Sequence, residues 1–547
     1  MDQYYQNNFK VVTTNSAIII NDYTMGDAPS LEYNFKIYDP LLHKSIPVGM
    51  YYNEETRQLY LPRGIDIAYV MRKLESKNTS DNPYEYTQIS CHGYDRLKSI
   101  KLRYAPRDDR QYEALKFMCC QEKYMHNMAK SQFGVNLPTG GGKTYCSTAA
   151  ISYLGIKSII ITAQSGILEQ WKHAIVEYTN LTPNDICKLE GSAPLNRILT
   201  NKSKSIDKQI YLVTHSTLKS YGDTYGWDKI GKLFEKLRIG LKFYDEAHQN
   251  FANMCMIDFY TNVYRTYYVT ATPKRSDKEE NRIYSLYMKS VPSINLFDEQ
   301  SDPHTKYMAI RFNSQPRPVD ISNCKSAYGL NRMRYIEYLM GNEYFWMMFD
   351  YIFNMVEKRG GRVLFYIGTN EAILKVRDRI LRHYPEYRDD IGIYTSISPC
   401  KQEEREKRFI LSTTKSAGAG EDIKGLKYSV VLAEPFRSDV LAQQTLGRTR
   451  DPNTFYIELV DLGFKQTGNY YNAKKPIFSK YALSMSQTDI NKYQIDQIAQ
   501  EAMEDRLKRI QRILKFNEPS MVEAITFMKS DMVEAIIFYD HRILKDG

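Results

Sequence analysis

The segment Leu137-Pro-Thr-Gly-Gly-Gly-Lys-Thr144 has the residue types of a phosphate-binding loop. Glycines allow a tight turn whose backbone N–H groups face an anion, and Lys143 adds a positive charge. The hydroxyl of Thr144 is an oxygen ligand of the kind that Mg²⁺ prefers. The pattern G-x-x-x-x-G-K-[ST] requires glycine at position 137, where this chain has leucine. The loop alone is therefore also compatible with an ordinary glycine turn.

A pair of acidic residues occurs later in the chain, in Asp245-Glu246-Ala247-His248, directly after an apolar run. The carboxylate of Asp245 can share a metal ion with Thr144. Glu246 is placed to orient or deprotonate an attacking water. The glycine loop and the paired acids together predict hydrolysis of a nucleoside triphosphate with Mg²⁺.

Composition narrows the class of protein. The chain has 547 residues, enough for several domains, and 43% of them are hydrophobic. No apolar run is long enough to span a membrane, and the first residues lack the pattern of a secretion signal. The eight cysteines show no CxxC spacing, which argues against a metal site and favours a reducing, cytoplasmic compartment. The net charge of +10 suits a polyanionic partner without requiring one.

Short apolar runs alternate with helix-length segments in two successive series. The first series includes Ile159–Ile161 and Leu241–Tyr244, and the second includes Val363–Ile367 and Phe455–Val460. Such runs, bounded by turns, are typical of parallel strands buried on both faces. Two α/β lobes are therefore expected, preceded by a small separate α/β domain.

The C-terminal tail has a helical pattern. Apolar residues keep roughly helical spacing from Ile495 to Leu514, and Met521–Phe527 is nearly repeated as Met532–Phe538. The offset between the two copies is close to three helical turns, so both would present the same face. We expect packing or partner-docking helices here.

Further motifs surround the glycine loop and the acid pair in a fixed order. In the first half they are Pro106–Gln111, Ile161–Trp171, Val213–Ser216 and Thr270–Pro273, the last continuing into Arg275 and Asp277. In the second half they are Gly361–Gly368, Ser412–Asp422 and Gln443–Arg450.

In this order the segments resemble the Q motif and motifs I to VI of superfamily 2 helicases, over roughly residues 104–465. The continuation of motif III into Arg-x-Asp is similar to the XPB-type repair helicases and the UvsW-type helicases of bacteriophages. The resemblance implies an α/β fold with two tandem RecA-like parallel-sheet lobes, a small N-terminal α/β domain and a helical C-terminal tail. Motifs Ia and Ib would contact a nucleic-acid backbone through hydroxyls, amides and helix N-termini.

The resemblance and the changes in pattern along the chain predict five parts. They are an accessory, DNA-contacting domain (1–105), lobe 1 with the ATP site (106–295), an interlobe linker (296–340), lobe 2 (341–465) and a C-terminal loop with a helical extension (466–547).

The resemblance also assigns site residues. Lys143, Glu246, Arg448 and Arg450 would be catalytic, and the two arginines would reach the γ-phosphate from lobe 2. Thr144 and Asp245 would hold Mg²⁺. The ATP-binding residues would be Arg107, Gln111, Thr139, Gly140, Gly141, Gly142, Lys143, Thr144, Gly420, Asp422 and Gln444. The usual spacing of motif VI puts its second arginine at position 451, where this chain has aspartate, so which arginine acts as the finger stays open.

The implied function is that of an ATP-dependent DNA helicase or translocase remodelling forked or branched DNA in replication, recombination or repair, with a virus as the source and the host cytoplasm as the compartment. Single-stranded or branched DNA is the expected partner, and no membrane partner is expected. The sequence identifies no protein partner. A DEAH-type RNA helicase and a duplex-DNA translocase subunit of a larger complex remain alternatives.

Strand separation also requires a wedge. The segment Lys465–Lys475 follows the last expected strand and combines a glycine, Tyr470, Tyr471 and three lysines. This composition favours a loop that stacks on a terminal base while holding phosphates.

Overall fold

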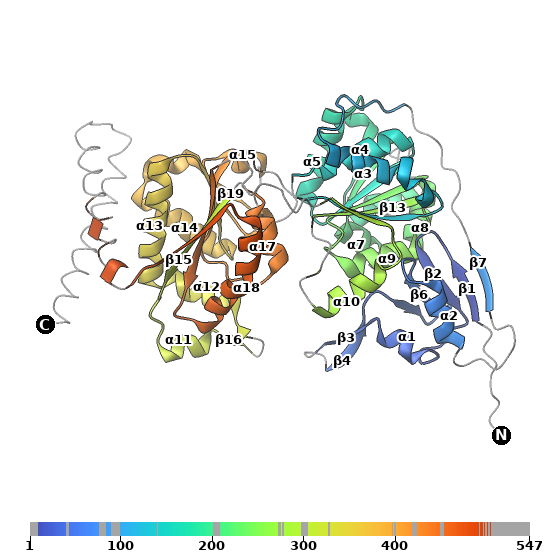
Figure 1. Cartoon of the computed structure of the whole chain (residues 1–547), viewed down its shortest axis with the longest axis horizontal. Helices are drawn as coiled ribbons and strands as arrows, with labels where there is room; N and C mark the ends of the chain where they lie inside the picture. The colour runs from blue at the N-terminus through green and yellow to red at the C-terminus, as the bar shows by residue number, and fades with distance from the viewer. Residues whose placement is uncertain are drawn as a thin grey trace, which may run out of the picture. The chain divides into compact units, whose positions relative to one another are not determined.

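The computed structural model divides into two units, Met1–Ser301 and Asp302–Gly547, each with its own core (Figure 1). It describes residues 9–504 except 40–42, 76–83, 89–98, 139, 201–207, 272–274, 276–277, 297–304, 327–328, 396–397, 399–400, 418–422, 424, 449–452, 492, 496, 498–499 and 502–503.

A seven-stranded sheet forms the centre of the first unit, in the order β10-β11-β9-β12-β13-β8-β14. Its strands are β8 (Gln132–Asn136), β9 (Ser158–Thr162), β10 (Ile186–Leu189), β11 (Ile210–Thr214), β12 (Leu241–Asp245), β13 (Arg265–Thr270) and β14 (Ser293–Asn295). Every pairing between them is parallel. All residues of β9, β11 and β12 are buried, as expected for a parallel sheet covered on both faces.

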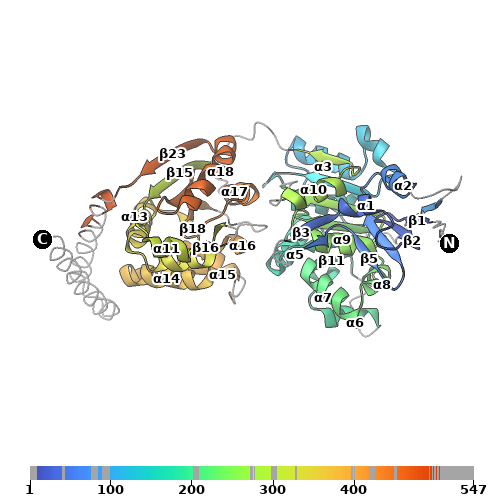
Figure 2. The same ribbon diagram turned by 90° about the horizontal axis from the view of Figure 1, so that it is seen from below.

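Helices cover both faces of this sheet. On one face α3 (Asp109–Met118), α4 (Lys143–Leu154) and α5 (Ser165–Tyr178) share a core with Ile160 and Phe243. On the other face α7 (His215–Tyr225), α8 (Asp228–Lys236), α9 (Phe251–Tyr260) and α10 (Lys278–Tyr287) share a core with Ile159 and Tyr244 (Figure 2). Alternate residues of the strands therefore face different helix layers.

The N-terminal residues form a five-stranded mixed sheet in the order β5-β6-β2-β1-β7. Its strands are β1 (Phe9–Thr13), β2 (Ala17–Asn21), β5 (Tyr51–Asn53), β6 (Gln58–Pro62) and β7 (Tyr84–Gln88), and α1 (Pro29–Tyr33), α2 (Ile67–Glu75) and the hairpin of β3 (Lys36–Asp39) and β4 (Lys44–Pro47) accompany it.

This sheet packs on α9 of the first lobe (Figure 1). Leu59 and Ile18 lie in the same hydrophobic core as Ile257, and the ring of Tyr60 stacks on Tyr260 at 5.2 Å between centroids. The N-terminal residues therefore form the expected small α/β domain with its own sheet, and the apolar face of that sheet is covered by a lobe helix.

The second unit also has a central sheet of seven parallel strands, in the order β19-β20-β18-β21-β22-β15-β23. Its strands are β15 (Thr305–Phe312), β18 (Arg362–Tyr366), β19 (Ile391–Tyr394), β20 (Phe409–Ser412), β21 (Leu426–Val431), β22 (Thr454–Asp461) and β23 (Ser484–Asp489). α12 (Arg332–Met340), α13 (Glu343–Arg359) and α14 (Asn370–His383) pack on one face, and α17 (Asp439–Leu446) and α18 (Lys465–Tyr481) pack on the other.

The prediction of a linker over 296–340 is wrong. Strand β15 pairs along its whole length with β22, from Thr305 opposite Thr454 to Phe312 opposite Asp461. Tyr335 and Leu339 of α12 are buried in the core of the second unit. The lobe also continues past residue 465, because β23 pairs with β15.

The predicted C-terminal helices are only partly described. Residues 493–495, 497, 500, 501 and 504 are helical, whereas the duplicated segments Met521–Phe527 and Met532–Phe538 lie outside the described residues. Over the part of the chain that the structure describes, no helix has the length and apolar character needed to cross a membrane.

A buried charged network joins the strands that carry the acid pair and motif III. Lys242 of β12 and Asp258 of α9 are fully buried and form an ion pair. Asp258 also accepts hydrogen bonds from the hydroxyls of Tyr244, Tyr268 and Tyr287. Every partner of this carboxylate is a buried donor, so the network is stable only when complete.

Replacing Asp258 with asparagine is expected to destabilise the first unit by about 3–5 kcal/mol, because Lys242 would keep a buried charge without its counterion. Denaturant unfolding of the full chain measures this through the transition of the first unit. The matched control is Asp228→Asn, which breaks the exposed pair between Asp228 and Lys232 and should leave that transition nearly unchanged. Equal unfolding midpoints for the two variants would contradict the assignment.

Candidate nucleotide site

The glycine loop connects β8 to α4 in the conformation that its sequence requires. Gly140 and Gly142 have φ values of +80° and +88°, a region that favours glycine, and α4 begins at Lys143. The N-terminus of this helix therefore faces the loop, which suits an anion. Leu137, the departure from the usual pattern, is fully buried in the core of the lobe. Thr139 lies outside the described residues.

The structure brings the loop lysine and the acid pair together. Nζ of Lys143 lies 2.8 Å from Oε1 of Glu246, and both side chains are largely buried. Asp245 ends β12, and its Oδ2 accepts a hydrogen bond of 2.8 Å from Nε1 of Trp171 on α5. Trp171 ends the motif Ia segment, and its contact with Asp245 depends on tertiary packing, which has no signal in the sequence.

Burial and the neighbouring charges shift the pKa values of Asp245, Glu246 and His248. Burial and the adjacent Glu246 carboxylate raise the pKa of Asp245 above its usual range, against the effect of Lys143. Burial also acts to raise the pKa of Glu246, but Lys143 and His248 outweigh it and hold that pKa low. Burial lowers the pKa of His248 to about 4. Glu246 is therefore ionised near neutral pH, as a general base must be.

Motif III lies against the acid pair. Oγ1 of Thr270, the last residue of β13, lies 2.8 Å from Nδ1 of His248 and 3.5 Å from Oε2 of Glu246. The backbone N–H of Ala271 also points to Oε2 of Glu246, at 3.5 Å. Motif III and the acid segment are thus joined by hydrogen bonds in the described residues.

Gln111 of the Q motif contacts the glycine loop. Its side chain is buried, its Oε1 accepts from the backbone N of Arg107 at 2.8 Å, and its Nε2 lies 3.5 Å from the carbonyl oxygen of Gly141. A Cβ atom at Gly142 would lie 2.1 Å from Nε2 of Gln111, so the third glycine is also required by this close approach. A guanidinium nitrogen of Arg107 donates to the carbonyl oxygen of Gly140 at 3.3 Å.

Motif Ib differs from its expected role. Thr214 is buried and caps α7 by accepting from the backbone N of Thr217, and His215 is buried beneath Tyr244. Among the motif Ib residues only Ser216 is exposed. Backbone contacts to a nucleic acid from this segment are therefore limited to Ser216 and the start of α7, because the other side chains serve the fold.

Motif VI occupies the end of α17 and the turn after it. Gln444 and Arg448 are buried, and Nε of Arg448 has no hydrogen-bond partner among the residues that the structure describes. A buried guanidinium with an unused donor is suited to an acceptor supplied from outside the protein chain. Arg450, Gly420 and Asp422 lie outside the described residues.

The prediction of an aromatic wedge loop is wrong. Lys465–Tyr481 is the helix α18, and Tyr471 is 2% exposed in the core of the second unit. Lys474 is buried as well, paired with Glu458 and 3.9 Å from the ring centroid of Phe436. The buried residues Thr467, Tyr471, Lys474 and Phe478 follow the helical repeat, a spacing that outweighs the loop-like composition.

The residues around the loop fit a magnesium nucleotide in their chemistry. Asp245 offers a carboxylate and Thr144 a hydroxyl, both hard oxygen ligands. A cation there would relieve the burial penalty that raises the pKa of Asp245. No group of three or more His, Cys, Asp or Glu in the described part of the chain could hold a metal.

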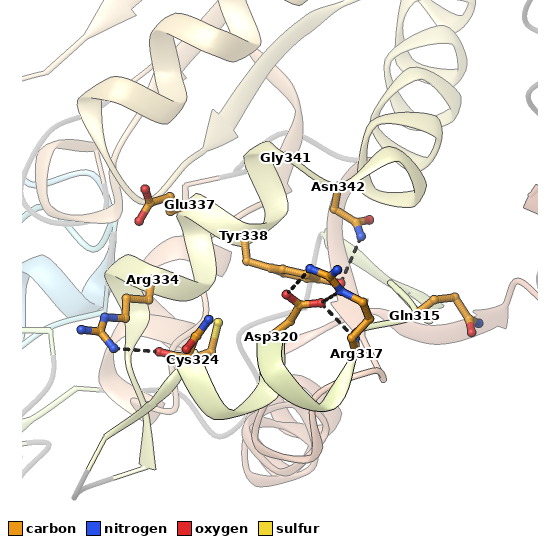
Figure 3. A pocket seen from close by; sticks show the side chains of 10 residues that line it. Gln315, Arg317, Asp320, Cys324, Arg334, Glu337, Tyr338, Gly341 and Asn342 are labelled. Atoms are coloured by element: carbon orange, nitrogen blue, oxygen red, sulfur yellow. Dashed lines mark hydrogen bonds and ion pairs between the residues drawn. The ribbon is translucent and has the colours of Figure 1, made fainter. Parts of the chain in front are cut away.

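An open hollow of about 740 Å³ lies in the second unit between α11 (Pro318–Asn323) and α12 (Figure 3). Arg317 forms hydrogen bonds of 3.0 and 3.1 Å with Asp320, and Arg334 donates to the carbonyl oxygen of Asn323 at 3.2 Å. Glu337 also lines the hollow. Two arginines thus face two carboxylates, and the lining has no excess positive charge for a polyanion.

Part of the chain is similar to known proteins. Residues 105–275 match the family model described as Type III restriction enzyme, res subunit. The Rad25 protein of Haloarcula marismortui is 26% identical over 208 residues, which cover 36% of this chain and 31% of that protein. The DNA 3′–5′ helicase XPB of Mycobacterium tuberculosis is 31% identical over 153 residues, 28% of this chain and 25% of that protein. Residues 105–275 are thus similar to a family of nucleic-acid enzymes, and part of the chain is similar to proteins named as DNA 3′–5′ helicases.

The matches to the curated relatives cover only part of each relative. The chain spans about a third or less of the length of the curated relatives that it matches. The crystal structure of T4 UvsW aligns over 88% of this chain and 100% of that chain, with 13% identity and a TM-score of 0.34. The two parallel seven-stranded sheets described above are the expected tandem RecA-like lobes.

Glu246→Gln is expected to lower ATP hydrolysis by at least on the order of 10²-fold while nucleotide still binds, because the amide keeps the shape of the side chain but cannot take a proton. Single-turnover hydrolysis and nucleotide binding, measured on the same preparation with DNA present, separate the two steps. Glu235→Gln, at an exposed position of α8, is the control and should match the wild type. Near-normal hydrolysis by Glu246→Gln would show that another group activates the water.

Proposed function

We propose that this chain is an ATP-dependent DNA helicase or translocase that remodels forked or branched DNA. The observation that carries the proposal is the cluster of Lys143, Glu246 and Asp245 at the glycine loop, within the segment matched by the family model. The relatives named as DNA 3′–5′ helicases support DNA over RNA and suggest travel from 3′ to 5′.

The residues have distinct roles in the proposed reaction. Lys143 would neutralise charge on the nucleotide phosphates, and Thr144 and Asp245 would hold Mg²⁺, which would supply further positive charge at the phosphates. Glu246 takes a proton from the attacking water, and its low pKa keeps it ionised for this step. Arg448 stabilises charge that develops on the γ-phosphate, with Arg450 as the second candidate for this role.

Motion follows from binding one nucleotide through two lobes. Binding favours an arrangement in which residues of both lobes contact the phosphates, and hydrolysis removes that link. Segments such as Ser216 at the start of α7 would hold the DNA backbone without reading its sequence. Cycles of binding and hydrolysis then advance the protein along one strand.

A second candidate is a motor subunit that moves on duplex DNA without separating its strands. The matching family model is described as a restriction-enzyme subunit, which favours this second candidate. It uses the same nucleotide residues, so the site cannot distinguish the two candidates.

The test compares ATPase stimulation by single-stranded DNA, branched DNA, duplex DNA and RNA at equal nucleotide concentration. The proposal predicts the largest stimulation with branched or single-stranded DNA. Stimulation by duplex alone, without strand separation, would support the motor subunit instead. Stimulation by RNA alone would contradict both.

A further inference from the structure

The turn that carries Glu246 has an unusual backbone. Glu246 and Asn250 have φ values of +53° and +50°, a conformation that residues other than glycine rarely adopt. The turn is closed by a hydrogen bond of 2.7 Å from the backbone N of Gln249 to the carbonyl oxygen of Glu246. A backbone of this kind persists only where its surroundings hold it in place.

Arg275 supplies a contact that holds this turn. One guanidinium nitrogen of Arg275 donates to the backbone carbonyl oxygen of His248, inside the turn. Its Nε donates to Oε2 of Glu280 at 2.7 Å, and its guanidinium lies 5.7 Å from the ring centroid of Phe251. The side chain is 16% exposed, so these contacts are largely shielded from water.

Helix α10 fixes Arg275 from the other side. The backbone N of Arg275 donates to Oδ1 of Asn281 at 2.8 Å, and Asn281 and Glu280 are neighbours on α10. The same helix is anchored to the N-terminal residues, because Arg282 donates to the carbonyl oxygen of Asn34 at 2.9 Å. Its Ile283 also packs against Gly49, where a Cβ atom would lie 2.9 Å away.

We propose that Arg275 is a positioning residue for ATP hydrolysis. It holds the carbonyl oxygen of His248, and thereby keeps the His248 ring at Thr270 and the Glu246 carboxylate at Lys143. Arg275 acts through the turn, since no contact places it on the nucleotide-binding loop itself among the described residues. This inference rests on the proposed function, because it assigns a role within the same hydrolytic site.

Steady-state ATPase of Arg275→Ala in the full chain, with DNA at saturation, tests the proposal. We expect kcat to fall roughly 10-fold or more, because a hydrogen bond from a charged donor is lost, and KM for ATP to stay within about threefold. Arg275→Lys should recover part of kcat, because an ammonium group can still donate to the His248 carbonyl. A purely structural role would lower the melting temperature without this division between kcat and KM.

Lys278→Ala is the matched control, because it removes an exposed cation from the same helix without touching the turn or the residues that hold Arg275, and it should keep the wild-type kcat. Unchanged kcat in Arg275→Ala, a proportional rise in KM, or no recovery with lysine would overturn the proposal. If Arg275→Ala does not fold, Glu280→Gln replaces it. That variant leaves the guanidinium without its carboxylate and should lower kcat in the same direction, and an unchanged kcat would overturn the proposal.

Failure of this inference is distinguishable from failure of the proposed function. A wild-type chain that does not hydrolyse ATP contradicts the proposed function itself. A wild-type chain that hydrolyses ATP, accompanied by an Arg275→Ala variant of equal kcat, contradicts only the role of Arg275.

Discussion

Lys143→Ala is expected to leave the chain without measurable ATP turnover while its fold is retained. The ammonium group lies in a largely buried site, 2.8 Å from Glu246, and no other lysine or arginine occurs in the glycine loop. Without it, the phosphate charge would lose a positive partner where water screens little. Glu246 would also lose the cation that lowers its pKa.

The measurement is ATP hydrolysis with and without DNA, with the melting temperature recorded on the same sample. Lys130→Ala, at an exposed position of the first unit, is the control and should behave as the wild type. Near-normal hydrolysis by Lys143→Ala, with an unchanged melting temperature, would show that the nucleotide binds elsewhere.

Arg448→Ala is expected to lower turnover by roughly 10³- to 10⁵-fold, the range typical of an arginine finger, with little loss of nucleotide affinity. The guanidinium is buried, and its Nε has no partner among the described residues, so it is available for an acceptor that forms in the reaction. Its charge matters most in the transition state, so kcat falls more than binding.

Turnover and ATP affinity of Arg448→Ala are compared with those of Arg450→Ala and of Arg437→Ala. Arg437 is exposed in the same lobe and is the control. If Arg450→Ala alone loses turnover, the finger is Arg450, one residue before its usual position. A loss of affinity equal to the loss of turnover would assign Arg448 to nucleotide binding.

The sequence predicted the parts of the fold that depend on local pattern. Ile159–Ile161 is apolar throughout and Leu241–Tyr244 is apolar except for Lys242, because a parallel sheet covered on both faces leaves no solvent-facing side. The glycine loop and the acid pair each end a strand, so their proximity followed from the expected sheet.

The parts that depend on tertiary context were not predictable in the same way. Residues 305–312 carry no turn or composition signal that assigns them to the second sheet, and their pairing with β22 is a long-range contact. The burial of Tyr471 was readable from helical spacing, but the glycine and lysines of its segment suggested a loop. Arg275 was recognised only as part of a motif, since its partners Glu280 and His248 meet through folding.

The most direct test of the central claim is ATP-dependent separation of a forked DNA by the full chain, followed by strand displacement in real time. The account predicts that the wild type separates the strands with ATP and Mg²⁺, that it stops when the metal is chelated, and that Lys143→Ala separates none. Separation that proceeds equally without ATP, or a wild type that hydrolyses ATP on this substrate and neither parts nor moves along it, would contradict the account.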